Sequence, residues 1–540
     1  MPSAHRGWET LALTLGALAA LRFVAILLRE NAYGIAKYYM ADDAFYYFQI
    51  ARNIATGLGP TFDGVHNTNG FHPLWLLIST GVFAFVQGSM APLLVLYALQ
   101  IGMLIGSAFM LFLAFKEFDR LSGAFTVALF LASWHTRKIL FAGMESSLAF
   151  VIASGLLLLA VRRRSRFFMP ASWPEAWGLL ALLLALSLAR LEAGSLAAAW
   201  LCVALVVDAR HGSHSRPRIL LVGLGLVVAG CAYVAWNLLL VGMALPISGL
   251  LKAGGHHSWD SVHAVLLGHR DAFIGLIAPP GGSPLAKWIS IAEGSILAVA
   301  LVACLVRVRR HYPCQVLGLI LFLVFAIAFV AVSAFVTNGI WAWYRWPALL
   351  AGVLATFSSI HFVLAHLRPV RLALALLAVV TTMAVVPDWY LTLRPHPLAD
   401  WSPLRGMVMD ETVRFIREEI PPGERIGGVS NGIFTYFCGR QIENLEGLAN
   451  GAAFYRARRD PTAYAAYLRE NRIRWIIFHA WSSDDRAYRF KAYVPTSQID
   501  RVYDLDSHYH LDLRRNAFFP DRPHGASLSE PNVYFVRLKP

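Results

Sequence analysis

The sequence predicts a mainly α-helical protein that crosses a membrane many times and ends in a small soluble α/β domain. Three observations support this fold class. The 540 residues are 57% hydrophobic with a mean hydropathy of +0.53, which excludes a disordered chain and an ordinary soluble protein. Long apolar runs alternate with short arginine-rich tracts as far as Val386. From Asp388 onward the composition becomes that of a soluble domain.

Apolar runs that are long enough, or nearly so, to cross a bilayer supply the predicted polytopic helical bundle, because a spanning helix needs roughly 20 residues. They are 10–28, 91–115, 121–134, 146–161, 177–188, 193–207, 219–240, 288–306, 314–335, 343–367 and 372–386. The run 74–86 is set apart, because counting it as a span would move every later arginine tract to the outside. We interpret it as a re-entrant or interfacial helix, which leaves about 11 spans.

The formal net charge of +14 is carried largely by arginines between the apolar runs. The main tracts lie at 162–166, 210–218, 307–310 and 368–371. Such clusters are typical of the cytoplasmic ends of spans, so we favour this explanation over a nucleic-acid surface and expect no nucleic-acid partner. Only one of the five cysteines, Cys438, lies in the soluble part, so no disulfide is expected within it, and no metal-ligand spacing appears.

The parity of the spans predicts which connections meet on the outer side of the cell membrane. The first apolar run has no small-residue cleavage site and is expected to remain as an anchor with a cytoplasmic N-terminus. The outer pieces are then 29–73, 135–145, 189–192, 241–287, 337–343 and everything after Pro387. Polar residues that are unusual for a membrane protein gather in these pieces, which predicts an outward-facing active cavity.

These assignments divide the chain into two predicted domains. Residues 1–388 form a transmembrane catalytic module with long outer loops at 29–73 and 241–287, and residues 389–540 form an extracytoplasmic α/β domain. In that domain we expect strands at 425–429, 474–479, 502–513 and 533–538, with helices at 411–420 and 462–471. Four polar residues of its loops, Asn431, Asn444, Glu446 and Asn450, are interpreted as turn formers.

Two adjacent aspartates, Asp42 and Asp43, follow the first span after a short polar loop. The run 44–55 has no glycine or proline and is predicted to be helical, with Asp42 as its N-cap and Asp43 in its first turn. Capping explains one aspartate, whereas two of them beside Tyr46 and Tyr47 indicate a function. A carboxylate in a partly dry cleft binds protons more tightly and can act as a general base toward a hydroxyl.

Other ionisable residues lie at the outer ends of spans, and each has two interpretations. Glu145 either reaches the membrane interface or lines the cavity. Arg190 and Glu192 form either a local ion pair, which we favour, or a ligand contact. Lys252 and Arg345 are cations on the outer side, where the phosphate of a lipid is a natural partner.

These residues resemble the GT-C superfamily of integral-membrane glycosyltransferases, in particular its bacterial members. The resemblance is carried by the Asp42-Asp43 pair and by the motifs T-F-D-G at 61–64, N-T-N-G-F-H-P-L-W at 67–75, G-M-E-S at 143–146, L-A-R-L-E at 188–192, P-I-S…K at 246–252 and W-Y-R-W-P at 343–347. The layout is also similar, because a long outer loop at 241–287 follows the first group of spans and a soluble domain follows the last. Glu192 stands where many relatives carry an aspartate.

The resemblance implies transfer of a hexosyl or pentosyl unit from a polyprenyl-phosphate-linked donor to an acceptor hydroxyl on the outer face, with inversion. The acceptor is a glycan, a lipid or a protein. One of Asp42 and Asp43 is implied to be the catalytic base, with the other orienting the acceptor or the base. Lys252 and Arg345 are implied to neutralise the leaving phosphate.

The remaining implied substrate-binding residues are Tyr46, Asn69, His72, Glu145, Arg190, Glu192 and Tyr344. No cofactor is required by this chemistry, although a divalent cation at the aspartate pair is left open. The alternative function is a transporter or flippase of lipid-linked saccharides, which would use the same cavity and the same cations. A transporter is expected to carry inverted repeats and charges near the membrane midplane, whereas the charges here lie at the ends of spans.

Overall fold

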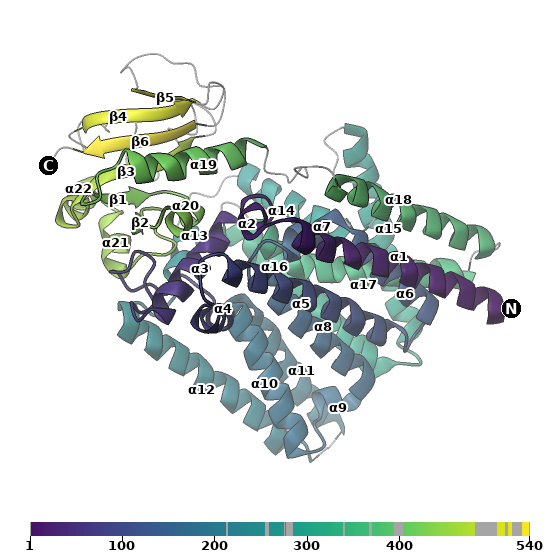
Figure 1. The fold of residues 1–540 in the computed structure, drawn as a ribbon. Coiled ribbons are helices and arrows are strands. Elements are labelled where there is room, and N and C mark those ends of the chain that lie inside the picture. The colour runs from purple at the N-terminus through teal and green to yellow at the C-terminus, as the bar shows by residue number, and fades with distance from the viewer. Residues whose placement is uncertain are drawn as a thin grey trace.

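The computed structural model describes residues 2–211, 214–253, 259–274, 276, 284–337, 341–366, 370–393, 403–480, 505–512, 517–520 and 532–538. Figure 1 shows a bundle of long helices with a smaller α/β domain packed against one end. The N-terminus of α1 (Pro2–Arg29) lies at the far end of the bundle from this domain.

Seven helices of the described residues are long and apolar enough to cross a membrane. They are α1, α5 (Ala91–Phe115), α8 (Ser146–Arg163), α11 (Gly194–His211), α12 (Arg216–Val241), α16 (Pro313–Val336) and α17 (Trp346–His366). The other predicted spans coincide with α6 (Arg120–Ala132), α10 (Trp173–Ala189), α15 (Pro284–Val308) and α18 (Val370–Leu393). The predicted polytopic helical membrane fold is therefore confirmed.

Packing within the bundle depends on small residues where helices cross closely. Gly16 of α1 faces Ala128 of α6, whose Cα would lie 3.4 Å from a Cβ at position 16. Large apolar side chains such as Leu224 of α12 and Ile327 of α16 stay exposed, as expected for helices that face lipid. The apolar helix α4 (Pro73–Phe85), which we interpreted as re-entrant or interfacial, has 13 residues and packs against α3 (Asp42–Ala55) and α10.

The connection from α1 to α4 is largely structured. It contains α2 (Ala32–Tyr38), whose N-terminus is capped by Asn31, and then α3, most of whose side chains are buried. At the other end of the membrane module, α18 continues to Leu393 and so extends past the predicted boundary at 388. The apolar run ends before the helix does, because helix formation does not require apolar residues.

The C-terminal domain, here residues 403–538, is built on a six-stranded mixed sheet of order β2-β1-β3-β6-β4-β5. The strands are β1 (Arg425–Gly428), β2 (Ile442–Asn444), β3 (Ile473–Ala480), β4 (Leu505–Asp512), β5 (Ala517–Pro520) and β6 (Asn532–Leu538). Strand β1 pairs in parallel with β2 and β3, and the remaining pairings are antiparallel. The helices are α19 (Pro403–Glu418), α20 (Gly432–Cys438), α21 (Ala452–Ala457) and α22 (Pro461–Glu470).

The C-terminal domain docks on α2 and α3 of the membrane module. Phe45 packs against Tyr436 and Phe437 of α20, with ring centroids 5.4 and 5.6 Å apart. Lys37 of α2 pairs with Asp410 of α19 at 2.6 Å. These contacts hold the domain over the start of α3, where the adjacent aspartates lie.

Candidate active site

A cavity of about 480 Å³ lies between α3, α13 (Ile247–Ala253) and α16, a size typical of small-molecule sites. Its ionisable lining residues are Asp43, Tyr46, Tyr47, His72, Glu145, Glu192, Lys252 and Tyr344. Helix α16 contributes an apolar wall that includes Phe329, Val332 and Val336. The cavity therefore suits a ligand that has both a polar group and an apolar chain.

Asp43 lines this cavity from the first turn of α3. Burial raises the pKa of its carboxyl group to about 7, and the negative charges of Glu446, Asp42 and Glu145 act in the same direction, whereas Lys252 opposes them. A carboxylate with a pKa near neutrality can accept a proton and release it again, which is what a general base requires.

Asp42 is not among the cavity-lining residues, and its side chain is turned toward the C-terminal domain. Its carboxylate accepts hydrogen bonds from the backbone N–H groups of Gly432 (3.2 Å) and Ile433 (2.8 Å) at the start of α20. The prediction that Asp42 is the N-cap of its own helix is wrong, because Ala41 holds that position. Asp42 instead satisfies free N–H groups of a helix in the other domain.

Only one of the two predicted phosphate-binding cations faces the cavity. Lys252 donates a hydrogen bond to the Tyr344 hydroxyl (2.5 Å). Burial lowers the pKa of Lys252, but Tyr344 and Asp43 outweigh burial and leave the pKa raised, so the ammonium stays charged.

Arg345 points elsewhere, so the structure does not bring it to the cavity. Its guanidinium lies against α14 (Trp259–Ile274), where a Cβ at Gly268 would be 2.6 Å from Nη2. Tyr344 and Arg345 belong to the 3₁₀ helix η2 (Ala342–Arg345), in which successive side chains point about 120° apart. Neighbouring residues of this helix therefore face different elements.

Arg190 forms a buried charged network at the edge of the cavity. Its Nη1 donates to Glu145 (2.6 Å) and its Nε donates to Glu192 (2.5 Å), so the ion pair favoured from the sequence is present. Its guanidinium also lies 4.5 Å from the ring centroid of Tyr344. Arg190 is 0% exposed and Glu145 is 1% exposed. Among the described residues, Nη2 of Arg190 and Oε2 of Glu145 have no hydrogen-bond partner, and such groups favour binding of a polar ligand.

His72 and Asn69 have different surroundings. The Nδ1 of His72 accepts a hydrogen bond from the Leu191 N–H (3.2 Å), and burial lowers its pKa, so the ring is neutral at the cavity wall. Asn69 is buried behind the wall, where its amide bonds to Asn237 (3.1 Å) and to the backbone of Ile247 (3.0 Å). Asn69 thus fixes the start of α13, which carries Lys252.

The C-terminal domain also contributes to the cavity, which the sequence did not indicate. Tyr46 donates a hydrogen bond to Glu446 (3.1 Å), a residue that we interpreted as a turn former. Leu448 lines the cavity, and its carbonyl oxygen would lie only 1.7 Å from a Cβ at Gly70. No local pattern predicts these contacts, because Tyr46 and Glu446 lie 400 residues apart in the sequence.

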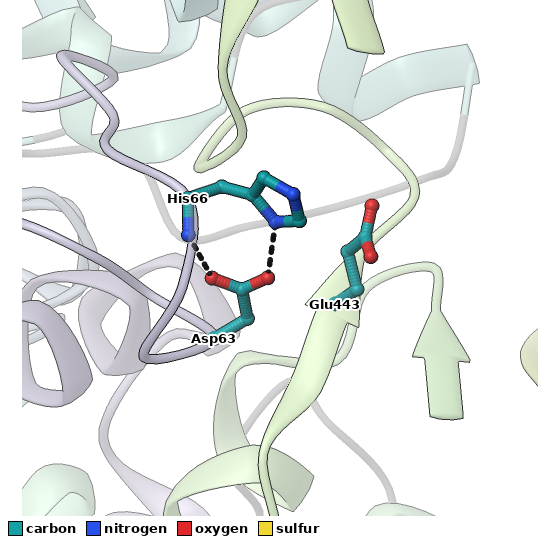
Figure 2. A group of neighbouring side chains, drawn as sticks. All are labelled: Asp63, His66 and Glu443. Carbon is teal, nitrogen blue, oxygen red and sulfur yellow. Dashed lines mark hydrogen bonds and ion pairs between the residues drawn. The ribbon is translucent and has the colours of Figure 1, made fainter. Parts of the chain in front are cut away.

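A second cluster of ionisable residues lies between the two domains, outside the lining of the cavity. It consists of Asp63 and His66 from the loop after α3 and Glu443 from β2 (Figure 2). Their candidate metal-ligand atoms lie within 4.8 Å of one another. This cluster is not the cation site that the sequence analysis left open, which was the Asp42-Asp43 pair.

Comparison with known proteins gives a fold match but little sequence similarity. No curated protein matches this chain, and residues 400–526 match a family described as a domain of unknown function (DUF8728). ArnT from Cupriavidus metallidurans bound to undecaprenyl phosphate is 13% identical over 96% of this chain and 97% of that chain, with a TM-score of 0.53. The same protein in the apo state gives a TM-score of 0.51, with 13% identity over 95% and 97% of the two chains.

The oligosaccharyltransferase AglB from Archaeoglobus fulgidus, in complex with an inhibitory peptide and a dolichol-phosphate, is 11% identical. The match covers 94% of this chain and 74% of that chain, with a TM-score of 0.50. ArnT and AglB are both membrane glycosyltransferases of the GT-C superfamily. The helical bundle, the docked C-terminal domain and these matches together show that this chain shares the fold of these GT-C proteins, in agreement with the resemblance noted in its sequence.

Proposed function

We propose that this protein transfers a sugar from a polyprenyl-phosphate-linked donor to an acceptor hydroxyl on the outer face of the membrane, with inversion. The observation that carries the proposal is the position of Asp43, whose pKa is raised to about 7, in the same cavity as the Lys252 cation. The C-terminal domain is then extracytoplasmic. Support also comes from the bound polyprenyl phosphates named for the ArnT and AglB structures.

In this reaction Asp43 acts as the base. Its ionised carboxylate takes the proton of the acceptor hydroxyl while the hydroxyl oxygen attacks the anomeric carbon from the face opposite the phosphate. The bond from that carbon to the phosphate oxygen breaks, and the polyprenyl phosphate leaves with one more negative charge. Lys252, held by the Tyr344 hydroxyl, stabilises that charge. These groups supply a base and a stabilised leaving group without a cofactor.

The other residues of the cavity suit the sugar and the lipid chain of the proposed donor. The buried Arg190 network and the neutral His72 provide polar contacts for a hexosyl or pentosyl unit. The apolar wall of α16 suits the first isoprene units of the donor. Glu446 of the C-terminal domain accepts a hydrogen bond from Tyr46, about one turn along α3 from Asp43, and its charge acts on Asp43, so this domain adds a second acid near the proposed base.

The proposal is tested with Asp43→Asn, using Asp260→Asn on the exposed face of α14 as a matched control. A general base contributes about 10²- to 10⁴-fold to a rate, so Asp43→Asn is expected to lower the rate of transfer by about this factor, whereas the control keeps the wild-type rate. Mass spectrometry of envelope glycans and lipid-linked sugars in a deletion strain that carries each variant measures this loss. Thermal unfolding of the purified variants checks that both remain folded.

Treating intact cells of the same strains with a membrane-impermeant periodate reagent before the mass spectrometry separates the transferase from the transporter, because only sugars on the outer leaflet are oxidised. An inactive transferase accumulates unreacted lipid-linked sugar on the outer leaflet, whereas an inactive transporter retains it on the inner leaflet. Normal glycans in the Asp43→Asn strain would reject the assignment of the base.

A further inference from the structure

We propose that Asp63, His66 and Glu443 bind a divalent zinc-type cation that joins the first outer loop to the C-terminal domain. This site is separate from the sugar-transfer cavity and does not depend on the function proposed above. It would be a structural site, in which one metal ion links two segments that are far apart in the sequence.

In each carboxylate of the cluster, one oxygen accepts hydrogen bonds from the protein and the other faces the centre of the cluster. Carboxylates that bind metals are commonly hydrogen-bonded in this way. Oδ1 of Asp63 accepts the backbone N–H groups of Val65 (3.0 Å) and His66 (2.8 Å), which leaves Oδ2 facing Nδ1 of His66 at 2.6 Å. Figure 2 shows Asp63 and the His66 ring on one side and the Glu443 carboxylate on the other.

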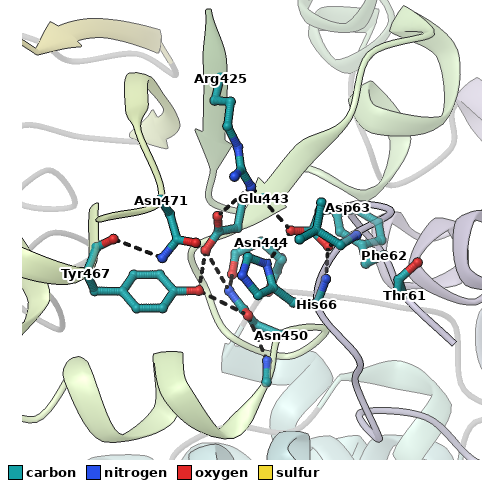
Figure 3. Close-up of polar contacts among 12 residues, drawn as sticks. Thr61, Phe62, Asp63, His66, Arg425, Glu443, Asn444, Asn450, Tyr467 and Asn471 are labelled. Carbon is teal, nitrogen blue, oxygen red and sulfur yellow. Dashed lines mark hydrogen bonds and ion pairs between the residues drawn. The ribbon is translucent and has the colours of Figure 1, made fainter. Parts of the chain in front are cut away.

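Glu443 has the same arrangement in the C-terminal domain (Figure 3). Its Oε1 accepts hydrogen bonds from the Tyr467 hydroxyl (2.5 Å) and from Nδ2 of Asn450 (3.2 Å). Its Oε2 is buried and has no hydrogen-bond partner among the described residues. Glu443 is 2% exposed and Asp63 is 4% exposed, so both acids have lost most of their contact with water. A buried carboxylate oxygen without a donor is costly, and a cation is its natural partner.

A cation already approaches both inward oxygens. Nη2 of Arg425 lies 3.8 Å from Oδ2 of Asp63 and 3.5 Å from Oε2 of Glu443, at ion-pair distance but too far for hydrogen bonds. The Arg425 side chain is 38% exposed, so it can move into solvent. A metal ion would take its place between the two acids with shorter and more directional bonds.

The ligand types favour zinc over magnesium or calcium. One imidazole nitrogen with two carboxylate oxygens matches the ligands of Zn²⁺, whereas Mg²⁺ and Ca²⁺ prefer oxygen alone. Metal–ligand distances of about 2.0–2.2 Å require ligand atoms roughly 3.3–3.5 Å apart, so a spread of up to 4.8 Å has to close by up to about 1.4 Å. Nδ1 of His66 and Oδ2 of Asp63, now 2.6 Å apart, have to separate by roughly 0.8 Å. The half-buried His66 ring can make this movement. Water would complete the coordination.

The consequence of such a site is a fixed geometry of the cavity. The loop that carries Asp63 and His66 continues to Gly70 and His72, and the loop that follows β2 leads from Glu443 to Leu448. Both segments end in the cavity wall. A metal ion bound by Asp63, His66 and Glu443 would therefore fix the position of these two segments of the cavity wall relative to each other.

The test uses the full-length protein in detergent, stripped with EDTA, desalted and titrated with ZnCl₂ by calorimetry, with bound zinc measured by mass spectrometry. Glu443→Gln and His66→Asn each remove one ligand and are expected to weaken zinc binding by at least about tenfold. The matched control is Glu418→Gln, because Glu418 is exposed on α19 and lies outside the cluster. It is expected to bind zinc as the wild type does.

Arg425→Ala provides the opposite expectation, which matters if a ligand variant fails to fold. Removing the competing guanidinium should tighten zinc binding, whereas a cluster that is only an ion-pair network would be destabilised without any gain in zinc affinity. Equal zinc binding by the wild type, Glu443→Gln and His66→Asn would overturn the proposal. Unchanged or weaker binding by Arg425→Ala would overturn it as well.

Discussion

The docking contact with α20 and the cavity meet at the start of α3, where two neighbouring aspartates have different surroundings. Asp42 belongs to the docking contact with α20, where backbone N–H groups hold its carboxylate, whereas Asp43 lines the cavity beside Lys252. Successive residues of an α-helix point about 100° apart, so adjacent acids can contact different partners. The comparison teaches that an acidic pair in a sequence can serve one structural and one chemical purpose.

After the loss of Asp43, the largest effect that we expect is on the binding of the lipid phosphate, when Lys252 and Arg345 are replaced in turn. Lys252→Met removes the charge at the cavity, whereas Arg345→Met removes one that faces α14. Losing a hydrogen bond to a charged group costs about 1.5–3 kcal/mol, so Lys252→Met should weaken undecaprenyl phosphate binding roughly 10- to 150-fold. Arg345→Met should change it far less. Microscale thermophoresis in detergent measures both affinities, and equal losses would break the distinction between the two positions.

A smaller effect is expected at the docking contact. Asp42→Ala leaves the first N–H groups of α20 without an acceptor, which costs about 0.5–2 kcal/mol for a helix cap. The amides of 432–438 should then exchange with deuterium faster, by roughly 2- to 30-fold, in exchange followed by mass spectrometry. Asp43→Asn should leave this exchange unchanged. Equal protection in Asp42→Ala and in the wild type would contradict the docking role.

The smallest effect is a shift in pH dependence that joins the two regions. The negative charge of Glu446 helps to raise the pKa of Asp43, so Glu446→Gln should lower that pKa. The proposed role of Asp43 as the base requires its ionised form, so sugar transfer is expected to be lost as the pH falls through about 7 in the wild type. In Glu446→Gln the loss should occur at lower pH, while Glu418→Gln should keep the wild-type profile. The acidic limb of the pH–rate profile, recorded in membranes, measures this shift. An unchanged profile in Glu446→Gln would contradict the influence of Glu446 on the pKa of Asp43.

Much of the fold could be predicted because its signals are local. The apolar runs predict the helices of the bundle, and the arginine tracts predict the orientation of these helices, without knowledge of tertiary contacts. The same parity brought Asp43, His72, Glu145 and Lys252 into one group, and the structure has them in one cavity. Their chemical roles remain predictions.

Other features could not be read from the sequence because they depend on long-range contacts. Glu446 and Glu443 lie in short loops and strands with no periodic signal, and their partners are in the first outer loop. The direction of Arg345 depends on a single turn of 3₁₀ helix, which hydropathy does not reveal. Asn69 was expected to bind a ligand. Its side-chain amide instead forms hydrogen bonds within the protein, because an amide can both donate and accept and so can link buried segments.

The close approach of Gly70 to the Leu448 carbonyl has a consequence for engineering. Any side chain at position 70 would collide with the backbone of the other domain, so the path of the Leu448 loop and the glycine depend on each other. A chimera that takes its C-terminal domain from a different protein would keep a working cavity only if the incoming loop follows the same backbone path past this glycine. The membrane helices and the C-terminal domain can therefore be recombined with other proteins only where this close backbone approach is preserved.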